Sequence, residues 1–293
     1  MDRTIGIIGL GIMGGAIARN LVDRNWHVIG FDIDPKRRNE LASVRVAIAS
    51  NAAQVARDAP IIMTSLPSPD AAHQVAQEIA DANLSQRIVA ELSTLSLADK
   101  IRFESILAKA GHVVLDCPLS GTGAQAKVRD LVVYASGNSE AIARCVELFA
   151  DFAKESADLG RFGNGSRMKF IANHLVAIHN VAAAEAMMLA ERAGLDPEKV
   201  VDMISPGAGS SRMFQMRAPM MVSRVYEPAT MKVSTWKKDM AIIAEFAEDV
   251  GCDVPLFNLT APIYSQAAEM GLGDKDTASV FEVLRTSTDR HSG

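Results

Sequence analysis

Hydrophobic residues in the first half of the chain form short runs of strand length, and these runs alternate with stretches of helical spacing. Six runs have the length and composition of buried strands: 4–9, 27–32, 60–66, 87–92, 112–118 and 131–136. Apolar residues recur at helical intervals over 12–24, 70–80 and 97–110. Strands that alternate with helices predict parallel βαβ units with helices on both faces of one sheet. The right-handed crossover rule then favours a doubly wound, Rossmann-type parallel sheet.

The second half of the chain has helical periods and almost no strand signal after about residue 160. Helices are predicted over 166–193, 198–205, 234–251 and 255–271. We therefore expect an α/β domain over residues 1–162 and an all-α domain over residues 163–293.

The stretch 166–193 predicts a long interdomain helix of about 28 residues, or about 42 Å at 1.5 Å per residue. It is apolar on more than one face, so we expect it to pack against a second subunit as well as its own domain. The sequence therefore predicts a homodimer or a homotetramer.

Three glycines, Gly9, Gly11 and Gly14, have GxGxxG spacing between the first predicted strand and the first predicted helix. In this context Gly9 permits a tight turn, Gly11 lets the backbone approach a pyrophosphate, and Gly14 lets the helix close on the strand. Ile12 and Met13 follow in the first helical turn, where free N–H groups and the helix dipole favour phosphate. The pattern predicts a dinucleotide site; the alternative is a glycine-rich turn without a ligand.

The acid Asp32 ends the second predicted strand, 21 residues after Gly11. A carboxylate there accepts hydrogen bonds from the adenosine ribose and repels a 2′-phosphate, which favours NAD. Lys36, Arg37 and Arg38 follow closely, so NADP stays possible if their loop turns towards the ligand. The alternative for these three is a solvated helix start.

Two further strands end at the same edge of the predicted sheet. Ligands of such sheets bind at this edge, where the carboxyl ends of the strands lie. Leu66 and Pro67 are expected to line the cofactor site, and Thr94 to form a hydrogen bond near the nicotinamide ribose. On spacing alone, an ordinary loop residue is the simpler interpretation of each.

The stretch "GNGSRMKFIANH" (163–174) begins the long predicted helix and carries Lys169 and Asn173 one turn apart. Residues four apart lie on one face of a helix. An ammonium beside an amide is a plausible proton donor with its positioning group. The alternative is a surface lysine with an asparagine neighbour.

Four blocks of sequence resemble those of the β-hydroxyacid dehydrogenases, which include 3-hydroxyisobutyrate dehydrogenase, tartronate semialdehyde reductase and L-threonate dehydrogenase. They are similar to the cofactor fingerprint, the DxPVSGG substrate segment, the catalytic GxGxxxKxxxN segment and the late KDL block of that family. In order, they are "GIIGLGIMGGAIARNL" (6–21), "DCPLSGTGAQA" (116–126), "GNGSRMKFIANH" (163–174) and "KKDM" (237–240). The resemblance covers nearly the whole chain.

The resemblance implies a role for each matching residue. Lys169 would be the general acid/base, and Asn173 would orient the substrate. Lys238 would lie near the nicotinamide and the substrate. The substrate carboxylate would be bound by Ser120, Gly121 and Thr122.

The chain departs from the family pattern at two places. Thr122 stands where the family has the second glycine, and "KVRDLVV" (127–133) replaces a small turn that contains glycine. In addition, "GAGSSRMFQMR" (207–217) resembles the sugar-acid members, which favours a hydroxylated acid such as threonate or glycerate. The alternative is a simple link between two helices.

The function expected from these features is NAD(P)-dependent oxidation of the hydroxyl of a small β-hydroxy acid, or reduction of the matching semialdehyde or ketone. One alternative is an imine reductase-like enzyme, although relatives of that type usually have Asp or Tyr in place of Lys169. The other is a catalytically silent nucleotide-binding interaction module, which would have lost that lysine.

Composition narrows the class further. The net charge of −5 without clustered Lys or Arg argues against nucleic acid as a partner. Three widely spaced cysteines without a CxxC pattern predict neither disulfides nor zinc, and the histidines show no metal-ligand grouping. No signal peptide and no 18-residue apolar stretch is evident, so a cytoplasmic protein without a membrane span is expected.

Overall fold

The computed structural model describes residues 3–289, which form two compact units. Unit 1 is Met1–Lys169 and unit 2 is Phe170–Gly293. The boundary between them falls inside one continuous helix, α8 (Asn164–Arg192).

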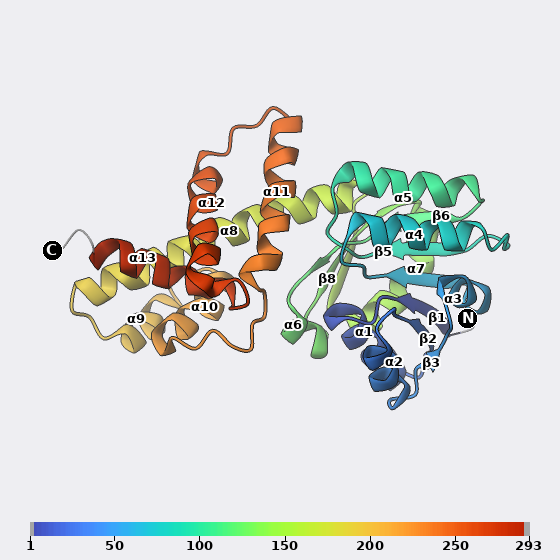
Figure 1. Cartoon of the computed structure of the whole chain (residues 1–293), viewed down its shortest axis with the longest axis horizontal. Helices are drawn as coiled ribbons and strands as arrows, with labels where there is room; N and C mark the ends of the chain where they lie inside the picture. The colour runs from blue at the N-terminus through green and yellow to red at the C-terminus, as the bar shows by residue number, and fades with distance from the viewer. Residues whose placement is uncertain (1–2, 290–293) are drawn as a thin grey trace. The chain divides into compact units, whose positions relative to one another are not determined.

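The centre of unit 1 is a parallel sheet with the strand order β3-β2-β1-β4-β5-β6 (Figure 1). Its strands are β1 (Thr4–Ile8), β2 (His27–Phe31), β3 (Ala47–Ile48), β4 (Ile61–Thr64), β5 (Ile88–Glu91) and β6 (Val113–Asp116). The connecting helices are α1 (Ile12–Asp23), α2 (Pro35–Ala42), α3 (Ala52–Asp58), α4 (Pro69–Ala80) and α5 (Leu97–Lys109). The order reverses next to β1, as in a doubly wound fold, so the predicted Rossmann class is confirmed.

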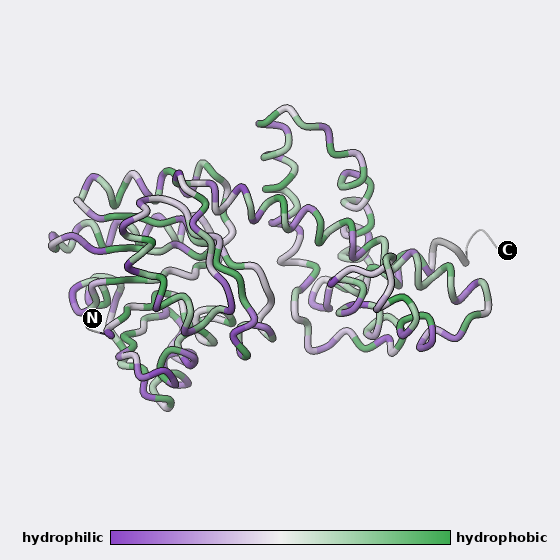
Figure 2. The backbone as a smooth tube through the Cα atoms, turned by 180° about the vertical axis from the view of Figure 1, so that it is seen from behind, coloured by the Kyte–Doolittle hydropathy of each residue, from purple (hydrophilic) through white to green (hydrophobic). Residues whose placement is uncertain are grey.

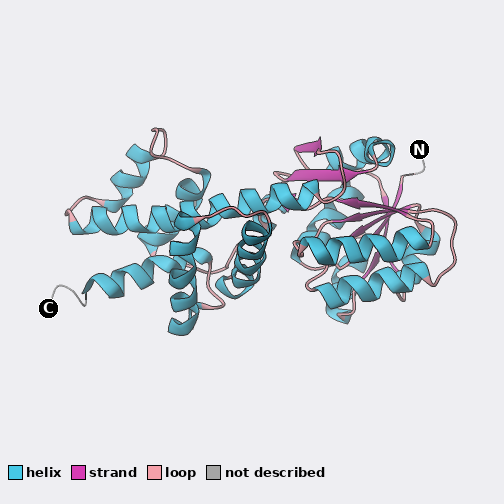
Figure 3. Cartoon of the chain, turned by 90° about the horizontal axis from the view of Figure 1, so that it is seen from above, coloured by secondary structure: helices cyan, strands magenta, loops and turns pink. Residues whose placement is uncertain are grey.

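Neighbouring residues of each strand point to opposite faces of the sheet, and both faces are covered by helices (Figure 3). Ile7 belongs to the core on one face and Ile8 to the core on the other, and each is 1% exposed. The central strands β1, β4 and β5 are buried at every residue and are mostly hydrophobic (Figure 2). Burial on both faces explains why the strands appear in the sequence as continuous apolar runs.

The far edge of the sheet differs from the prediction of an entirely parallel sheet. Strand β8 (Val132–Gly137) runs antiparallel to β6 and to β7 (Leu119–Ser120), and β9 (Glu155–Asp158) is parallel to β8. A parallel pair needs a long crossover, usually a helix. Only β7 and the five-residue helix α6 (Gly123–Lys127) lie between β6 and β8, so β8 returns in the opposite direction. Helix α7 (Ser139–Phe152) then leads to β9.

Unit 2 consists of helices, with one isolated bridge between Lys232 and Asp276, over the part that the structure describes. After the last part of α8 come α9 (Pro197–Ile204), α10 (Arg212–Ser223), α11 (Val233–Asp249), α12 (Pro255–Ala267), η1 (Ala268–Leu272), η2 (Thr277–Ser279) and α13 (Val280–Asp289). The predicted all-α class of this half is confirmed. Within residues 3–289, no helix is both long and apolar enough to cross a membrane.

Buried polar contacts fasten the helices of unit 2 to one another. The Asn180 amide donates to the Tyr264 hydroxyl at 2.9 Å and to the Thr277 carbonyl at 2.9 Å, which joins α8, α12 and η2. Arg217 of α10 is 2% exposed and forms an ion pair with the fully buried Asp276. Asp276 also accepts the Thr230 N–H at 2.8 Å, so this pair fixes the segment between α10 and α11.

Candidate active site

The turn between β1 and α1 needs glycine at two positions because the protein's own backbone passes close to it. Gly9 has φ 93°, and a Cβ atom there would lie 2.1 Å from the Ser65 carbonyl oxygen. A Cβ atom on Gly14 would lie 1.9 Å from the Gly9 carbonyl oxygen. These contacts give the tight turn and the close helix–strand packing expected of Gly9 and Gly14.

Gly11 is different, because protein packing does not require it. A Cβ atom there would meet only the far end of the Arg37 side chain, 3.3 Å away. Helix α1 has no side-chain N-cap hydrogen bond, and Ile12 and Met13 of its first turn are exposed and half-buried respectively. An open backbone at the positive end of a helix fits the pyrophosphate of a dinucleotide. The geometry of this turn therefore supports a dinucleotide site, and the cofactor role of these residues stays a prediction.

Asp32 is buried where β2 ends, and its carboxylate fastens two loops together. One oxygen accepts the Leu10 N–H at 2.8 Å and the other accepts the Asp34 N–H at 2.8 Å. The Arg37 guanidinium lies 3.4 Å from Asp32 and 3.6 Å from Asp34. Arg38 donates to the Asp32 carbonyl at 2.6 Å. Both arginines are thus turned towards acceptors at the end of β2.

The ends of β4 and β5 lie next to each other, since the two strands are paired in parallel. The Leu66 N–H donates to the Ser93 hydroxyl at 2.8 Å, and the Ser93 N–H donates to Glu91 at 2.9 Å. Leu66 and Thr94 are half-buried and Pro67 is exposed. The structure therefore brings the three predicted residues to one edge of the sheet. Ser93, which was not among the predicted residues, lies with them.

The predicted substrate segment follows β6 and packs against the fingerprint helix. Ser120 ends β7, and Gly121 has φ 132°, a left-handed conformation that favours glycine. The Asn20 amide of α1 donates to the Ala126 carbonyl of α6 at 2.7 Å. A Cβ atom on Gly123 would lie 2.3 Å from Ile12. The cofactor and substrate segments are therefore in direct contact.

Thr122, which replaces the family's second glycine, already has a partner within its own segment. Its N–H and its hydroxyl donate to the Gln125 side-chain oxygen at 3.0 and 3.3 Å. The Gln125 amide nitrogen donates to Asp130 at 3.0 Å, and Lys154 donates to Asp130 at 2.6 Å. This chain of contacts orders the segment in which the sequence departs from the family pattern.

The first turn of α8 is held tightly against the ends of β6 and β8. Gly163 has φ 89°, and a Cβ atom on Gly165 would lie 2.3 Å from the Tyr134 carbonyl oxygen. The Gly165 N–H donates to Ser136 at 2.9 Å. Ser166 donates to Asp116 twice, from its N–H at 2.7 Å and from its hydroxyl at 2.9 Å. The glycines of "GNGS" therefore permit a close approach, and Ser166 fixes it.

Lys169 lies three residues after Ser166 on the same helix and is 9% exposed. It is counted with unit 1, the unit that carries the nucleotide fingerprint. A lysine this buried does not fit the alternative of a solvated surface side chain. Its catalytic role stays a prediction.

Asn173, one turn further along α8, is 5% exposed and belongs to unit 2. Its amide nitrogen donates to Asp239 at 3.2 Å, and the Lys238 ammonium lies 3.5 Å from the other oxygen of Asp239. Unit 2 therefore brings two predicted site residues to one carboxylate. Asp239 was not among the predicted site residues, although its place inside "KKDM" indicated a role.

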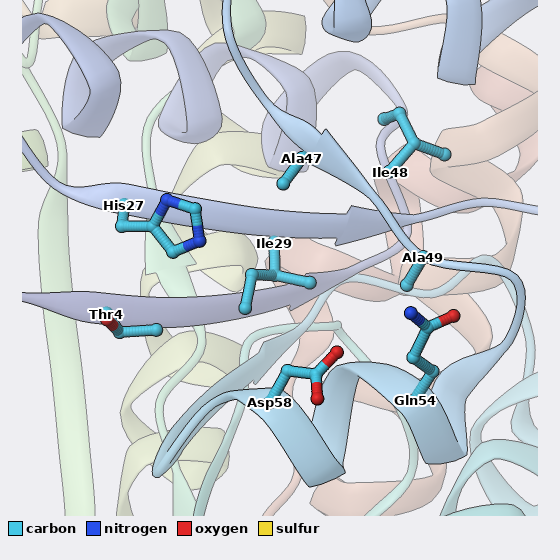
Figure 4. Close-up of a pocket in the computed structure, with 8 residues that line it drawn as sticks. All are labelled: Thr4, His27, Ile29, Ala47, Ile48, Ala49, Gln54 and Asp58. Carbon is cyan, nitrogen blue, oxygen red and sulfur yellow. The ribbon is translucent and has the colours of Figure 1, made fainter.

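Within residues 3–289, no cluster of three or more His, Cys, Asp or Glu side chains could hold a metal ion. A pocket of about 280 Å³ lies between β1, β2, β3 and α3 (Figure 4). Thr4 and His27, which line it, begin their strands, whereas ligands of such sheets bind where the strands end. This pocket is therefore not the nucleotide site.

The fold and the fingerprint define a dinucleotide-binding protein of the Rossmann class. Residues 4–160 match the family model of the NAD-binding domain of 6-phosphogluconate dehydrogenase. Residues 163–284 match a second family model, which is described as NAD-binding of NADP-dependent 3-hydroxyisobutyrate dehydrogenase. The chain belongs to the β-hydroxyacid dehydrogenase family, as the resemblance of its four sequence blocks predicted.

Named relatives match along almost the whole chain. L-threonate dehydrogenase of Cupriavidus necator is 29% identical over 97% of this chain and 97% of its own length. The structure of 3-hydroxyisobutyrate dehydrogenase of Mycobacterium tuberculosis, determined with L-serine, has a TM-score of 0.88 at 26% identity and covers 97% of this chain and 100% of its own. An imine reductase of a Pseudomonas species is more distant, with a TM-score of 0.62 at 18% identity over 96% of this chain and 99% of its own. That likeness shows the fold alone.

Proposed function

We propose that this enzyme oxidises the hydroxyl of a small β-hydroxy acid, or reduces the matching semialdehyde or ketone, with Lys169 as general acid/base. The observation that carries the proposal is the burial of Lys169, which is 9% exposed, on a helix whose first turn is fixed by two hydrogen bonds to Asp116. A proton-transfer group must be held in one geometry by a rigid element, and this arrangement supplies one.

Each residue has a distinct part in the proposed reaction. A bound nicotinamide dinucleotide supplies the hydride acceptor for oxidation and the hydride donor for reduction. Lys169 takes the proton from the substrate hydroxyl in oxidation and returns it to the carbonyl oxygen in reduction. Asn173 lies about 6 Å further along the helix axis and orients the substrate. Because Asp239 accepts from its amide nitrogen, the amide oxygen is directed away to accept from a hydroxyl.

The substrate carboxylate is assigned to Ser120, Gly121 and Thr122. Since the N–H and hydroxyl of Thr122 donate to Gln125, we assign the direct hydrogen bonds mainly to the Ser120 hydroxyl and the Gly121 backbone. Lys238 adds a positive charge for the acid. A hydroxylated acid such as threonate or glycerate is supported by the segment 207–217 and by the similarity to an L-threonate dehydrogenase.

NAD is the proposed cofactor rather than NADP. Asp32 and Asp34 place two carboxylates where β2 ends, and Arg37, which could attract a 2′-phosphate, lies between them at 3.4 and 3.6 Å. A 2′-phosphate would have to displace Arg37 from both acids and would then face their negative charge.

A homodimer or homotetramer is the proposed assembly. Met168, Ile171 and Leu175 follow one face of α8 and are 39%, 53% and 46% exposed. An apolar stripe of this kind suits a second copy of the chain. A cytoplasmic location is also proposed, supported by the three free cysteines.

The experiment is an absorbance assay at the nicotinamide band, with NAD and with NADP. The panel holds threonate, glycerate, serine, 3-hydroxyisobutyrate and 3-hydroxypropionate. We expect saturable NADH production with at least one acid, and a fall in kcat of about 100-fold or more in Lys169→Ala. NADH affinity should be unchanged in that variant. Lys199→Ala, which removes a lysine with an 82% exposed side chain from α9, is the control and should behave as wild type.

Two outcomes would replace the proposal. Turnover of a cyclic imine with no turnover of any acid would favour the imine reductase alternative. Cofactor binding without turnover of acids, semialdehydes or imines would favour the silent binding module. Turnover only with NADP would refute the assignment of NAD and leave the reaction standing.

A further inference from the structure

A cluster of three charged side chains is fully buried behind the predicted site. Lys100 of α5, Glu91 at the end of β5 and Asp116 at the end of β6 are each 0% exposed. The Lys100 ammonium lies 3.0 Å from Asp116 and contacts the Glu91 carboxylate. It also donates to the Glu91 carbonyl oxygen at 3.3 Å. These three acceptors match the three donors of an ammonium group.

The surroundings of Lys100 stabilise its protonated, charged form. Burial lowers the pKa of Lys100, but the charges of Asp116 and Glu91 and their hydrogen bonds outweigh it, so the pKa is raised above its usual value. Lys100 is therefore protonated at neutral pH, and it balances one of the two carboxylate charges.

Two hydrogen-bonded chains lead from Lys100 to segments that carry predicted site residues. Through Asp116, one chain reaches both the N–H and the hydroxyl of Ser166, in the first turn of α8. Through Glu91, the other reaches the Ser93 N–H, and the Ser93 hydroxyl accepts the Leu66 N–H. The first chain ends three residues before Lys169, and the second ends where the cofactor is expected.

We propose that Lys100 is a positioning residue that holds the first turn of α8, and with it Lys169, in register with the ends of β4 and β5. This role rests on the proposed function of Lys169. Lys100 acts through Asp116 and Ser166 on one side and through Glu91 and Ser93 on the other.

Stability alone is a weak reason for such a cluster. Buried ion pairs and triads are often replaced by apolar residues of similar volume without loss of stability. Here the carboxylates on both sides of the ammonium also hold the two segments whose relative position matters for hydride and proton transfer. A displacement of about 1 Å at a reacting group can cost about 100-fold in rate.

The test is Lys100→Met, assayed with the acid that the panel identifies. We expect kcat to fall by about tenfold or more, while the KM for the acid and the affinity for NADH change less than about threefold. Lys109→Met is the matched control, because Lys109 lies on the same helix and is exposed. A wild-type kcat in Lys100→Met, even with a lower melting temperature, would overturn the proposal.

Ser166→Ala tests the same chain of contacts if Lys100→Met does not fold. It removes one hydroxyl and no charge, so it perturbs folding less. A several-fold lower kcat at unchanged NADH affinity supports the chain through Asp116, and an unchanged kcat overturns it.

A double-variant comparison separates this proposal from the proposed function. If Lys100 acts through Lys169, adding Lys100→Met to Lys169→Ala should lower the residual kcat by less than about twofold. A further tenfold fall would overturn the role through Lys169. A wild-type kcat in Lys169→Ala alone would refute the proposed function and this role together, whereas a wild-type kcat in Lys100→Met alone would refute only the positioning role.

Discussion

Replacing Gly165 by alanine tests whether the start of α8 is docked as described. A Cβ atom at this position would lie 2.3 Å from the Tyr134 carbonyl oxygen, 2.7 Å from the Asp116 carbonyl oxygen and 3.0 Å from the Pro118 ring. Ordinary contacts of a Cβ atom begin at about 3.4 Å, so the helix must move by about 1 Å. Two of the three obstacles are backbone atoms of the sheet, which cannot turn aside as a flexible side chain can.

The movement should break contacts that the site needs. The hydrogen bond from the Gly165 N–H to Ser136, at 2.9 Å, and that from the Ser166 N–H to Asp116, at 2.7 Å, both cross the same interface. Each buried group left unsatisfied costs about 1–3 kcal/mol. Alanine gains at most about 1 kcal/mol over glycine in helix propensity. We expect a net loss of about 2–4 kcal/mol. We also expect a kcat about 100-fold lower, because the displaced turn leads directly into the turn that carries Lys169.

Thermal unfolding and single-turnover kinetics would check both numbers. For a unit of 169 residues, the expected loss corresponds to a melting temperature lower by roughly 5–15 °C. Gly273→Ala is the control, because Gly273 has helical dihedral angles and its Cβ atom would meet only Ser234 at 3.9 Å. A Gly165→Ala protein with the wild-type melting temperature and kcat would refute the docking of α8 and the reason given for its glycines.

Four further predictions test other parts of the structure. Gly11→Ala should change the melting temperature by less than about 1 °C relative to wild type, because the new Cβ atom meets only the end of Arg37. It should weaken NADH binding about tenfold or more in a fluorescence titration. A wild-type affinity for NADH would place the pyrophosphate elsewhere. Arg217→Met should destabilise unit 2 by about 3–5 kcal/mol in urea unfolding, since it leaves the buried Asp276 charge without its partner, and a change below about 1 kcal/mol would contradict this. Burial raises the pKa of Cys145 to about 12 and that of Cys117 well above its usual range, so iodoacetamide at pH 8 should alkylate the exposed Cys252 alone in the native protein, as counted by mass spectrometry. Because both buried thiols lose their protons more readily when unfolded, the melting temperature should fall as the pH rises above the ordinary thiol pKa of 9.0.

The sequence predicts the parts of this fold that local patterns determine. Buried strands such as β1 and β4 are continuous apolar runs, and helices such as α4 start at a capping serine, so both kinds of element are visible within a short window. The fingerprint glycines are also local, and the structure shows the tight turn at Gly9 and the close helix–strand packing at Gly14. The short strands β3 and β7 were not predicted. Each has only two residues, which is too short to show a periodic pattern.

Contacts between distant residues could not be predicted in the same way. The direction of β8 depends on how the chain between Cys117 and Leu131 folds, and apolar content does not distinguish a parallel strand from an antiparallel one. Lys100 appears in the sequence as one more polar residue of an amphipathic helix. Its partners Glu91 and Asp116 lie 9 and 16 residues away, and the sheet alone brings the ends of β5 and β6 together beneath it.

The position of Lys169 within α8 explains why one helix carries both predicted catalytic side chains. The boundary between the two compact units falls between Lys169 and Phe170, so Lys169 is counted with the Rossmann unit and Asn173 with the helical unit. The helix is continuous across that boundary, and its geometry alone fixes their separation at about 6 Å along the axis. The proposed proton-transfer group and the amide proposed to orient the substrate are therefore carried by the same helix. The register of this helix on the sheet must be fixed by other contacts. Gly165, Ser166 and the buried Lys100 cluster provide them.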